Sequence, residues 1–256
     1  MSDLIEVVRM HLLITVFAVF IVAASVQRLT GIGFSLVALP LLIPLVGPLD
    51  GVTLIVINSA ATSMIMTIGS YREIAWKPLV VLSVPSVIVA FPVIMLLNRV
   101  SEAIVSLTVG GLLLGCTLVL AFNIRVRQLR SGCGPVAAGL ISGILNATAG
   151  VAGPSLGVFS ASVGWSHRVF VATAQPFFIF SDLAVLGAKA IFQDSQSGFV
   201  VSGDTALAAI AGCMVGLFIG SRFIKKVSDT IGRRLVVGAS GVGAVGTLFS
   251  AIIHLV

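Results

Sequence analysis

Two glycine-rich stretches of this chain combine the residue types that bind a small anion without a metal ion. The first, QRLTGIGFS, spans residues 27–35, and the second, NATAGVAGPS, spans residues 146–155. Glycines let the backbone approach a ligand closely, and a helix that begins after such a turn offers free N–H groups and a positive dipole end. Arg28 would add a full positive charge. Neutral donors would come from Ser35, Asn146, Thr148 and Ser155.

The composition indicates an integral membrane protein made of helices. Of the 256 residues, 58% are hydrophobic and only 9% are charged, and the mean hydropathy is +1.18. Soluble domains carry about 25% charged residues. The apolar segments are too long and too uniform for barrel strands, which alternate with period two, so helices remain. The net charge of +6 is therefore assigned to cytoplasmic loops and not to nucleic-acid binding.

Three further polar residues lie inside apolar segments. Asn58 in VINSAATS and Gln175 in VATAQPFF occupy similar places in the two halves, where each either lines a site or bonds a neighbouring helix. Asp182 in FSDLAVLG is a candidate for proton coupling, unless it pairs with Lys189 one or two turns later. Polar groups at membrane depth are costly and usually face the protein interior or a cavity. All three are therefore expected in the interior.

The apolar segments divide into two similar halves. Ten segments span residues 10–27, 34–47, 52–69, 78–97, 103–122, 135–147, 151–163, 169–189, 205–221 and 235–253. Two stretches of the first half recur in the second, because NRVSEAIVSLTVGG resembles KKVSDTIGRRLVVG and TGIGFSLVALP resembles AGVAGPSLGVF. We expect a first repeat at residues 1–124, a basic cytoplasmic linker at 125–134 and a second repeat at 135–256.

The basic residues predict that the second repeat is inverted relative to the first, because five crossings per repeat reverse its direction. With both termini outside, the cytoplasmic side holds twelve basic residues: Arg28, Arg72, Lys77, Arg125, Arg127, Arg130, Arg168, Arg222, Lys225, Lys226, Arg233 and Arg234. The outer side holds Arg9, Arg99 and Lys189, which agrees with the positive-inside rule. In the alternative, segments 34–47 and 151–163 only dip into the membrane, each half crosses four times, and the repeats are parallel.

The short segments predict a helical hairpin at the start of each repeat. A helix rises about 1.5 Å per residue, so segments 135–147 and 151–163 are too short for a hydrocarbon core of about 30 Å. They would enter from the cytoplasm and turn at NATAG, while segments 10–27 and 34–47 would enter from outside and turn at RLTGIG. Such backbone must be buried or line a cavity. In the alternative, both hairpins cross fully and Arg28 is a cytoplasmic loop residue.

Other glycines have a packing explanation. Pairs four residues apart are typical of close helix contacts in membranes. Such pairs are Gly111 with Gly115, Gly139 with Gly143, and Gly216 with Gly220.

The two glycine-rich stretches resemble the signatures of a known family. QRLTGIGFSLVALPLL and LNATAGVAGPSLGVF are similar to the two signatures of the TauE/SafE-like sulfite exporters, and ATAQPFF and the duplicated architecture fit as well. The resemblance covers residues 12–253. Many members have a fuller run of glycines where Phe34 and Ser35 follow Gly33, and this form resembles a branch with QR.TG.GF. The resemblance implies secondary transport of small sulfur-containing anions, namely sulfite and organosulfonates such as sulfoacetate or sulfolactate.

The resemblance also implies which residues line the substrate site. From the first signature these are Gln27, Arg28, Gly31, Gly33 and Ser35. From the second they are Asn146, Thr148, Gly150, Gly153 and Ser155, with Gln175 beside them. Asn58 joins this set on its position alone.

The favoured function is a secondary anion transporter of the inner membrane, working by alternating access and exporting its substrate. A passive anion channel or an importer on the same fold is the alternative. An enzyme is not expected, because His11, His167 and His254 are scattered and show neither metal-ligand nor catalytic-triad spacing. No cofactor, metal or nucleic acid is expected. The expected partners are the small anion, the lipid bilayer and a coupling proton or sodium ion, with the oligomeric state open.

Overall fold

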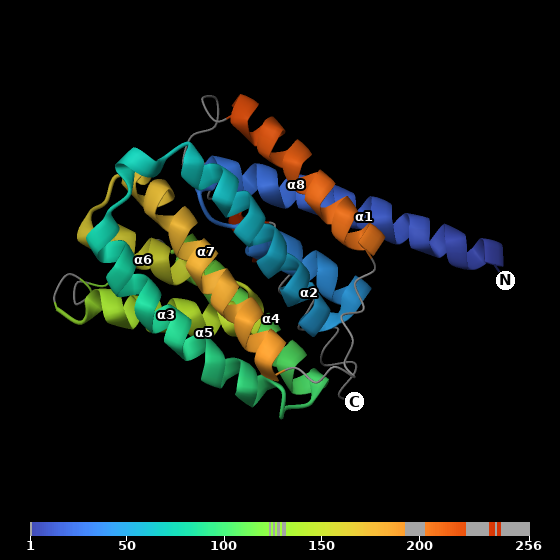
Figure 1. Cartoon of the computed structure of the whole chain (residues 1–256), viewed down its shortest axis with the longest axis horizontal. Helices are drawn as coiled ribbons and strands as arrows, with labels where there is room; N and C mark the ends of the chain where they lie inside the picture. Colours follow the sequence, from blue (N-terminus) through green and yellow to red (C-terminus); the bar gives the residue numbers. More distant parts are fainter. Residues whose placement is uncertain are drawn as a thin grey trace.

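The computed structural model describes residues 2–122, 124, 126, 129, 132–192, 203–223, 236–238 and 240–241. Its elements in chain order are α1 (Ser2–Thr30), α2 (Phe34–Ile68), a short 3-10 helix η1 (Tyr71–Glu73), α3 (Trp76–Leu97), α4 (Glu102–Ala121), α5 (Gly134–Ala149), α6 (Gly153–Val163), α7 (His167–Phe192) and α8 (Gly203–Phe223) (Figure 1). Within these residues the fold is all-helical. Six of the helices, α1 to α4, α7 and α8, are long and apolar enough to cross a membrane. An all-α polytopic membrane protein is thereby confirmed.

The outer faces of the helices are apolar, whereas many polar side chains lie inside. On α3, the residues Val80, Val84 and Ile88 recur every four positions and are each more than half exposed. Gln27 and Gln175, in contrast, are 1% and 0% exposed. This distribution suits a protein whose solvent is lipid, because an apolar stripe faces the bilayer and polar groups pair internally.

The long helix α2 is a sharp hairpin. Gly47 has φ 79° and ψ 168°, which is outside the helical region, and glycine adopts this conformation without steric cost. A side chain at Gly51 would lie 3.4 Å from Leu39 Cδ1 and 3.8 Å from Leu42 Cβ. Residues twelve apart on a straight helix are about 18 Å apart, so the chain reverses at Gly47. The break predicted between segments 34–47 and 52–69 is this reversal.

The helices α5 and α6 are short, as the sequence predicts. They contain 16 and 11 residues. At about 1.5 Å per residue their lengths are about 24 Å and 17 Å, which is less than a hydrocarbon core of about 30 Å. At these lengths neither helix alone reaches across the core.

The turns that end α1 and α5 have the same backbone geometry. The N–H of Gly31 donates to the carbonyl of Gln27, and the N–H of Gly150 donates to the carbonyl of Asn146, both at 2.7 Å. Both glycines have positive φ, 78° and 63°, which ends the helix and turns the chain. Gln27 and Gly31 are related to Asn146 and Gly150 by one sequence offset, so the two turns are equivalent.

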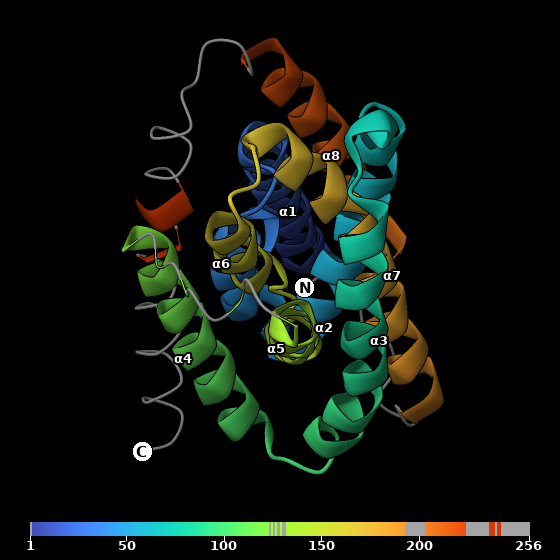
Figure 2. The same ribbon diagram turned by 90° about the vertical axis from the view of Figure 1, so that its left-hand side faces the viewer.

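Glycines bring two pairs of helices into close contact. On α5, a side chain at Gly143 would meet the Cα of Ser86 on α3 at 2.7 Å. On α8, a side chain at Gly216 would meet Ala24 Cβ on α1 at 2.9 Å. The packing of α3 with α5 and of α1 with α8 dominates the helix contacts, and Figures 1 and 2 both show α8 beside α1. The packing explanation for these glycines is confirmed.

The glycine pair on α4 behaves differently. Among the described residues, no atom lies within 4 Å of a side chain built at Gly111 or Gly115. Figure 2 shows α3 and α4 diverging from the turn that joins them. Thr117 on α4 instead donates to Ser240 Oγ at 2.9 Å, in the described part of the tenth predicted segment.

Parts of the sequence-based prediction lie outside the described residues. These are most of segment 235–253, the copied stretch at residues 225–234 with its four basic residues, and Arg125, Arg127 and Arg130 of the linker. The boundaries of the two repeats therefore stay a prediction.

Candidate functional site at the meeting of two turns

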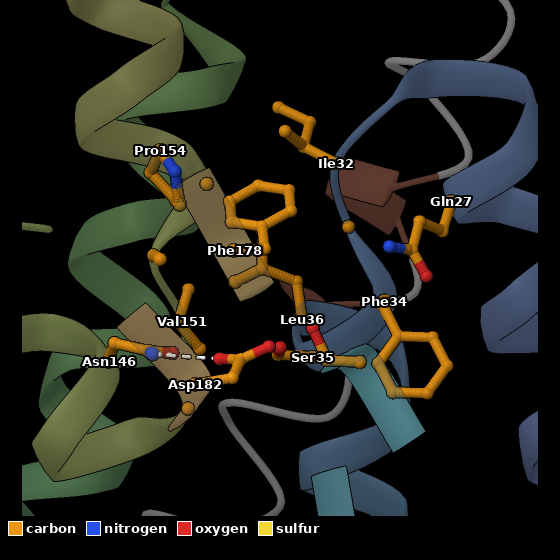
Figure 3. Close-up of a pocket in the computed structure, with 15 residues that line it drawn as sticks. Gln27, Ile32, Phe34, Ser35, Leu36, Asn146, Val151, Pro154, Phe178 and Asp182 are labelled. Carbon is orange, nitrogen blue, oxygen red and sulfur yellow. Dashed lines mark hydrogen bonds between the residues drawn. The ribbon is translucent and has the colours of Figure 1, made fainter. Parts of the chain in front are cut away.

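The two glycine-rich turns meet at one small cavity beside α7. Its volume is about 20 Å³. A water molecule needs about 10–15 Å³ measured in this way, so the cavity holds about one water. Predicted site residues that line it are Gln27, Gly33, Ser35, Asn146, Gly150, Gly153 and Asp182. The other lining residues are Ile32, Phe34, Leu36, Ser59, Val151, Ala152, Pro154 and Phe178 (Figure 3).

Two helices begin at this cavity, and neither has a side-chain cap. The first residue of α2 is Phe34, and the first residue of α6 is Gly153. Both helices lack a hydrogen bond from a capping side chain to their first turn. Their first backbone N–H groups and positive dipole ends therefore remain available at the cavity. Pro154 removes one of these donors from α6.

The first polar network joins α5 to α7 at the floor of the cavity. Asn146 Nδ2 donates to Asp182 Oδ1 at 2.8 Å and to Ser181 Oγ at 2.9 Å. Ser181 also shares a 3.0 Å hydrogen bond with Ser86 on α3. Within the described residues, Asp182 Oδ2 and Asn146 Oδ1 are buried without a partner. The network therefore leaves two acceptor oxygens without a donor.

The second polar network joins α1, α2 and α7 beside the cavity. Gln27 Nε2 lies 3.4 Å from both Ser63 Oγ and Gln175 Oε1, and Thr62 Oγ1 donates to Gln27 Oε1 at 3.0 Å. Gln175 Nε2 donates to the carbonyl of Gly31 at 3.1 Å. Two buried amides thus hold the first turn against α7.

The two networks are equivalent in sequence but differ in charge. The offset that relates the two turns also relates Thr62 to Ser181 and Ser63 to Asp182. Both networks therefore combine the amide at the end of a helix with a pair of polar residues on a longer helix. The first network has the Asp182 carboxylate in that pair, whereas the second has only the hydroxyls of Thr62 and Ser63.

Several predicted residues lie away from the cavity. Arg28 Nε donates to Ser221 Oγ on α8 at 3.0 Å. Asn58 Nδ2 bonds the carbonyl of Leu54 on its own helix at 2.8 Å. Thr148 is buried on α5, Ser155 Oγ donates to the carbonyl of Ala138, and Gly31 faces Val171. Their part in substrate binding stays a prediction.

The alternative partner for Asp182 is wrong. Lys189 Nζ donates to the carbonyl of Leu49 at 3.1 Å and to Thr53 Oγ1 at 2.5 Å. Its ammonium is therefore held by the second arm of α2 and does not pair with Asp182.

The serine and threonine residues of the networks were not predicted. Ser59 and Ser63 occupy one face of α2, at positions four apart in VINSAATS, and Ser181 directly precedes Asp182. Hydroxyls also bond the backbone of their own helix, as Ser162 does to Val158. The sequence does contain a pattern that could have predicted them, because each half has a pair of polar residues at the same distance from the amide of its turn. This pattern is recognisable only after the two turns have been aligned.

The described residues contain no group of three or more His, Cys, Asp or Glu side chains that would hold a metal ion. The site therefore consists of amides, hydroxyls, one carboxylate and backbone N–H groups.

Comparison with known proteins identifies the family of this chain. The model of the family described as Sulfite exporter TauE/SafE matches residues 16–247, which include both turns and the whole of α7. Searches of curated proteins and of solved structures found no match. The family is one of membrane transporters, so transport and not catalysis is the shared activity. This chain belongs to the TauE/SafE sulfite exporter family.

Proposed function

We propose that this multi-pass membrane transporter binds a small sulfur-containing oxyanion, sulfite or an organosulfonate, at the cavity between its two glycine-rich turns. The proposal is supported most by two uncapped helix starts, at Phe34 and Gly153, that meet at one small cavity. Each start contributes a partial charge of about +0.5 and free N–H groups, which together suit one anion. Ser35 lines the same cavity, and its hydroxyl would add a neutral donor.

Alternating access is the proposed mechanism. The cavity has room for about one water, which is less than an oxyanion needs, so the substrate enters only after the walls separate. Phe34 and Phe178 form part of these walls (Figure 3). A permanently open channel would need continuous space through this region. Rocking of one half against the other would open the cavity to each side in turn.

Contacts between loops support the proposed topology, with both termini outside. The Glu73–Arg168 ion pair, at 2.7 Å, joins two loops that the positive-inside rule assigns to the cytoplasm. Asn98 Nδ2 donates to the carbonyl of Phe192 at 2.9 Å, which joins two loops assigned to the outside. Both pairs agree with one orientation of the inverted repeats.

The meeting of the turns supports re-entrant hairpins. If both hairpins crossed fully, the turn after α1 and the turn after α5 would lie on opposite sides of the membrane. A side chain at Gly153 would instead lie 3.0 Å from Ile32 Cβ. Both turns therefore have to reach the same depth. The proposal also includes export of the anion and a location of the protein in the inner membrane.

Transport of labelled sulfite into liposomes tests the site. Ser35→Ala removes one neutral donor, worth about 0.5–1.5 kcal/mol, so its KM should rise about two- to tenfold with little change in folding. Thr108→Ala is the matched control, because its hydroxyl bonds the carbonyl of Ile104 on α4 and Thr108 does not line the cavity. Arg28→Ala tests the sequence-based prediction for Arg28. Equal KM values for wild type and Ser35→Ala would remove Ser35 from the site, and absence of saturable flux in wild type would overturn the function.

The same liposomes distinguish a carrier from a channel, and export from import. A carrier exchanges labelled for unlabelled sulfite across the membrane and saturates, whereas channel flux stays linear in concentration. Inside-out and right-side-out vesicles give the direction. Uptake that occurs only into inside-out vesicles is the result expected for an exporter.

A further inference from the structure

We propose that the ionised Asp182 carboxylate occupies the anion site when no substrate is bound. The transported anion would enter only when Asp182 takes up a proton. Each cycle would then move one proton together with one anion. This inference rests on the proposed function and adds its coupling ion. A carboxylate lies at the cavity, although the two helix starts and the neutral donors around it favour a bound anion.

Asp182 lies at the cavity with one carboxylate oxygen unpaired in the described part of the chain. Its side chain is 2% exposed, and it lines the cavity on which both helix starts converge. Asn146 holds Oδ1 at 2.8 Å, while Oδ2 has no partner in the described part of the chain. Figure 3 shows the free oxygen on the side of the carboxylate that faces Ser35 at the start of α2. The free oxygen therefore lies where an oxygen of the substrate would lie.

No positive side chain of the described residues neutralises Asp182. The groups facing it are uncharged: Asn146 from α5, Ser35 and Ser59 from α2, and Ser181 from its own helix. The first turn contributes the neutral amide of Gln27, and α6 contributes Gly153 and Pro154. Lys189 is bound to Leu49 and Thr53 and faces Asp50, away from the cavity. In the described structure, no basic side chain offsets the carboxylate.

The two helix ends are enough for one negative charge but not for two. Together they supply a charge of about +1. A second anion about 4 Å from an ionised Asp182 would bind on the order of a thousandfold more weakly at an effective dielectric constant of about 20. A proton on Oδ2 removes this repulsion, and its O–H becomes a donor to the substrate. Binding of the anion and ionisation of Asp182 therefore exclude each other.

The proton balance is simple. Asp182 gains a proton from the water on the side where the anion enters, and it returns that proton to the water on the side where the anion leaves. No bond in the substrate breaks. A singly charged anion and one proton cross together without moving net charge. Export would then take one proton out with each anion, and the anion's own concentration gradient would drive it, because an inward proton gradient opposes it.

A proton is a better match to the cavity than a sodium ion. Sodium requires a shell of oxygen ligands, and the positive ends of two helices would oppose any cation that stays ionised beside them. A proton on Asp182 needs no such shell and becomes part of a neutral carboxyl group.

Liposomes containing wild type or Asp182→Asn test the inference. Asn is a neutral isostere of the protonated acid, so this variant should still exchange labelled sulfite at equal pH on both sides. It should lose accumulation driven by a pH gradient, at least tenfold relative to wild type. Asp204→Asn is the matched control, because Asp204 is an exposed acid at the start of α8 paired with Arg9. It should keep full accumulation. All variants meet the same sulfite, so its own protonation cancels in the comparison.

A second measurement needs no variant. With a pH-sensitive dye inside the liposomes, sulfite gradients should move protons in wild type in a ratio of about one to one after correction with Asp182→Asn. If Asp182→Asn fails to fold, Asp182→Ser replaces it, since Ser63 shows that a hydroxyl suits the equivalent position.

The outcomes separate the two proposals. Accumulation by Asp182→Asn equal to wild type, accumulation driven by a sodium gradient alone, or loss of exchange in a folded Asp182→Asn would each overturn the coupling role. Wild-type sulfite flux would persist in all three cases. No saturable sulfite flux in wild type would overturn the proposed function, and the inference with it.

Discussion

Gly31 is the single residue on which the shape of the first turn depends most. Its φ of 78° and its close approach to Val171 are both required for the carbonyl of Gly31 to reach Gln175. An L-residue in the left-handed region costs about 1–2 kcal/mol, and the added methyl would lie 2.5 Å from Val171 Cγ2.

Gly31→Ala should therefore lower the free energy of unfolding by about 2 kcal/mol or more, since overpacking adds to the backbone strain. Gly111→Ala is the control, because the described neighbourhood of Gly111 is open and alanine favours a helix by up to about 1 kcal/mol. A thiol-reactive dye that labels the buried Cys116 and Cys213 on unfolding gives the melting temperature in detergent. A melting temperature of Gly31→Ala equal to that of Gly111→Ala would show that the turn relaxes without cost.

Helical register explains which of the predicted residues lie at the cavity. Gln27 and Arg28 are neighbours on α1, so their side chains point about 100° apart, and only Gln27 faces the cavity. The composition of the turn gave no means to choose between them. The predicted glycines at positions 33, 150 and 153 also line the cavity, because a turn brings its whole backbone to one place.

The pairing of helices depends on glycine at two interfaces. Ser86 on α3 lies against Gly143 on α5 so closely that no side chain fits without separating the helices. The same helices carry Asn146 and, through Ser86, one end of the Ser181 network. A wider gap would therefore also disturb the cavity.

Gly143→Leu should reduce folded yield and lower the melting temperature by several degrees, because the backbone of α3 cannot yield as a side chain would. Gly115→Leu on α4 is its control, since no atom of the described residues lies within 4 Å of that position. The dye-based melting assay applies again. Equal losses in the two variants would indicate a general effect of leucine and no specific contact between α3 and α5.

The sequence was informative about elements where their lengths are unusual. The short segments at 135–147 and 151–163 correspond to α5 and α6, because their bounds are set by proline and glycine. The pairing of α1 with α8 was not predicted, since it depends on contacts between residues almost two hundred positions apart. Hydrophobic pattern gives the apolar face of a helix but not its partner.

At the scale of the whole molecule, the proposed alternating access requires the two turns to separate and meet again. A covalent link between them should stop the cycle while leaving the fold intact. Ile32 and Gly153 are the natural positions, because the Cβ atoms would lie 3.0 Å apart, close to the range of about 3.5–4.5 Å in disulfides.

The double variant Ile32→Cys, Gly153→Cys should cross-link under mild oxidation, in a background where Cys116, Cys133 and Cys213 are replaced. Oxidised protein should lose most of its sulfite flux, and a reducing agent should restore it. Each single cysteine variant controls for the substitution itself. Full flux in protein shown by mass spectrometry to be cross-linked would contradict alternating access at this cavity.

Under the proposed coupling through Asp182, the single carboxylate at the described cavity limits the concentration gradient that the protein can maintain. One acid carries one proton, so at most one proton is spent per anion, and the largest concentration ratio is about tenfold for each pH unit across the membrane. For a singly charged anion this ratio is the same at any membrane voltage. With this coupling, pH alone would set the steady-state level of the substrate, and depolarisation would leave that level unchanged.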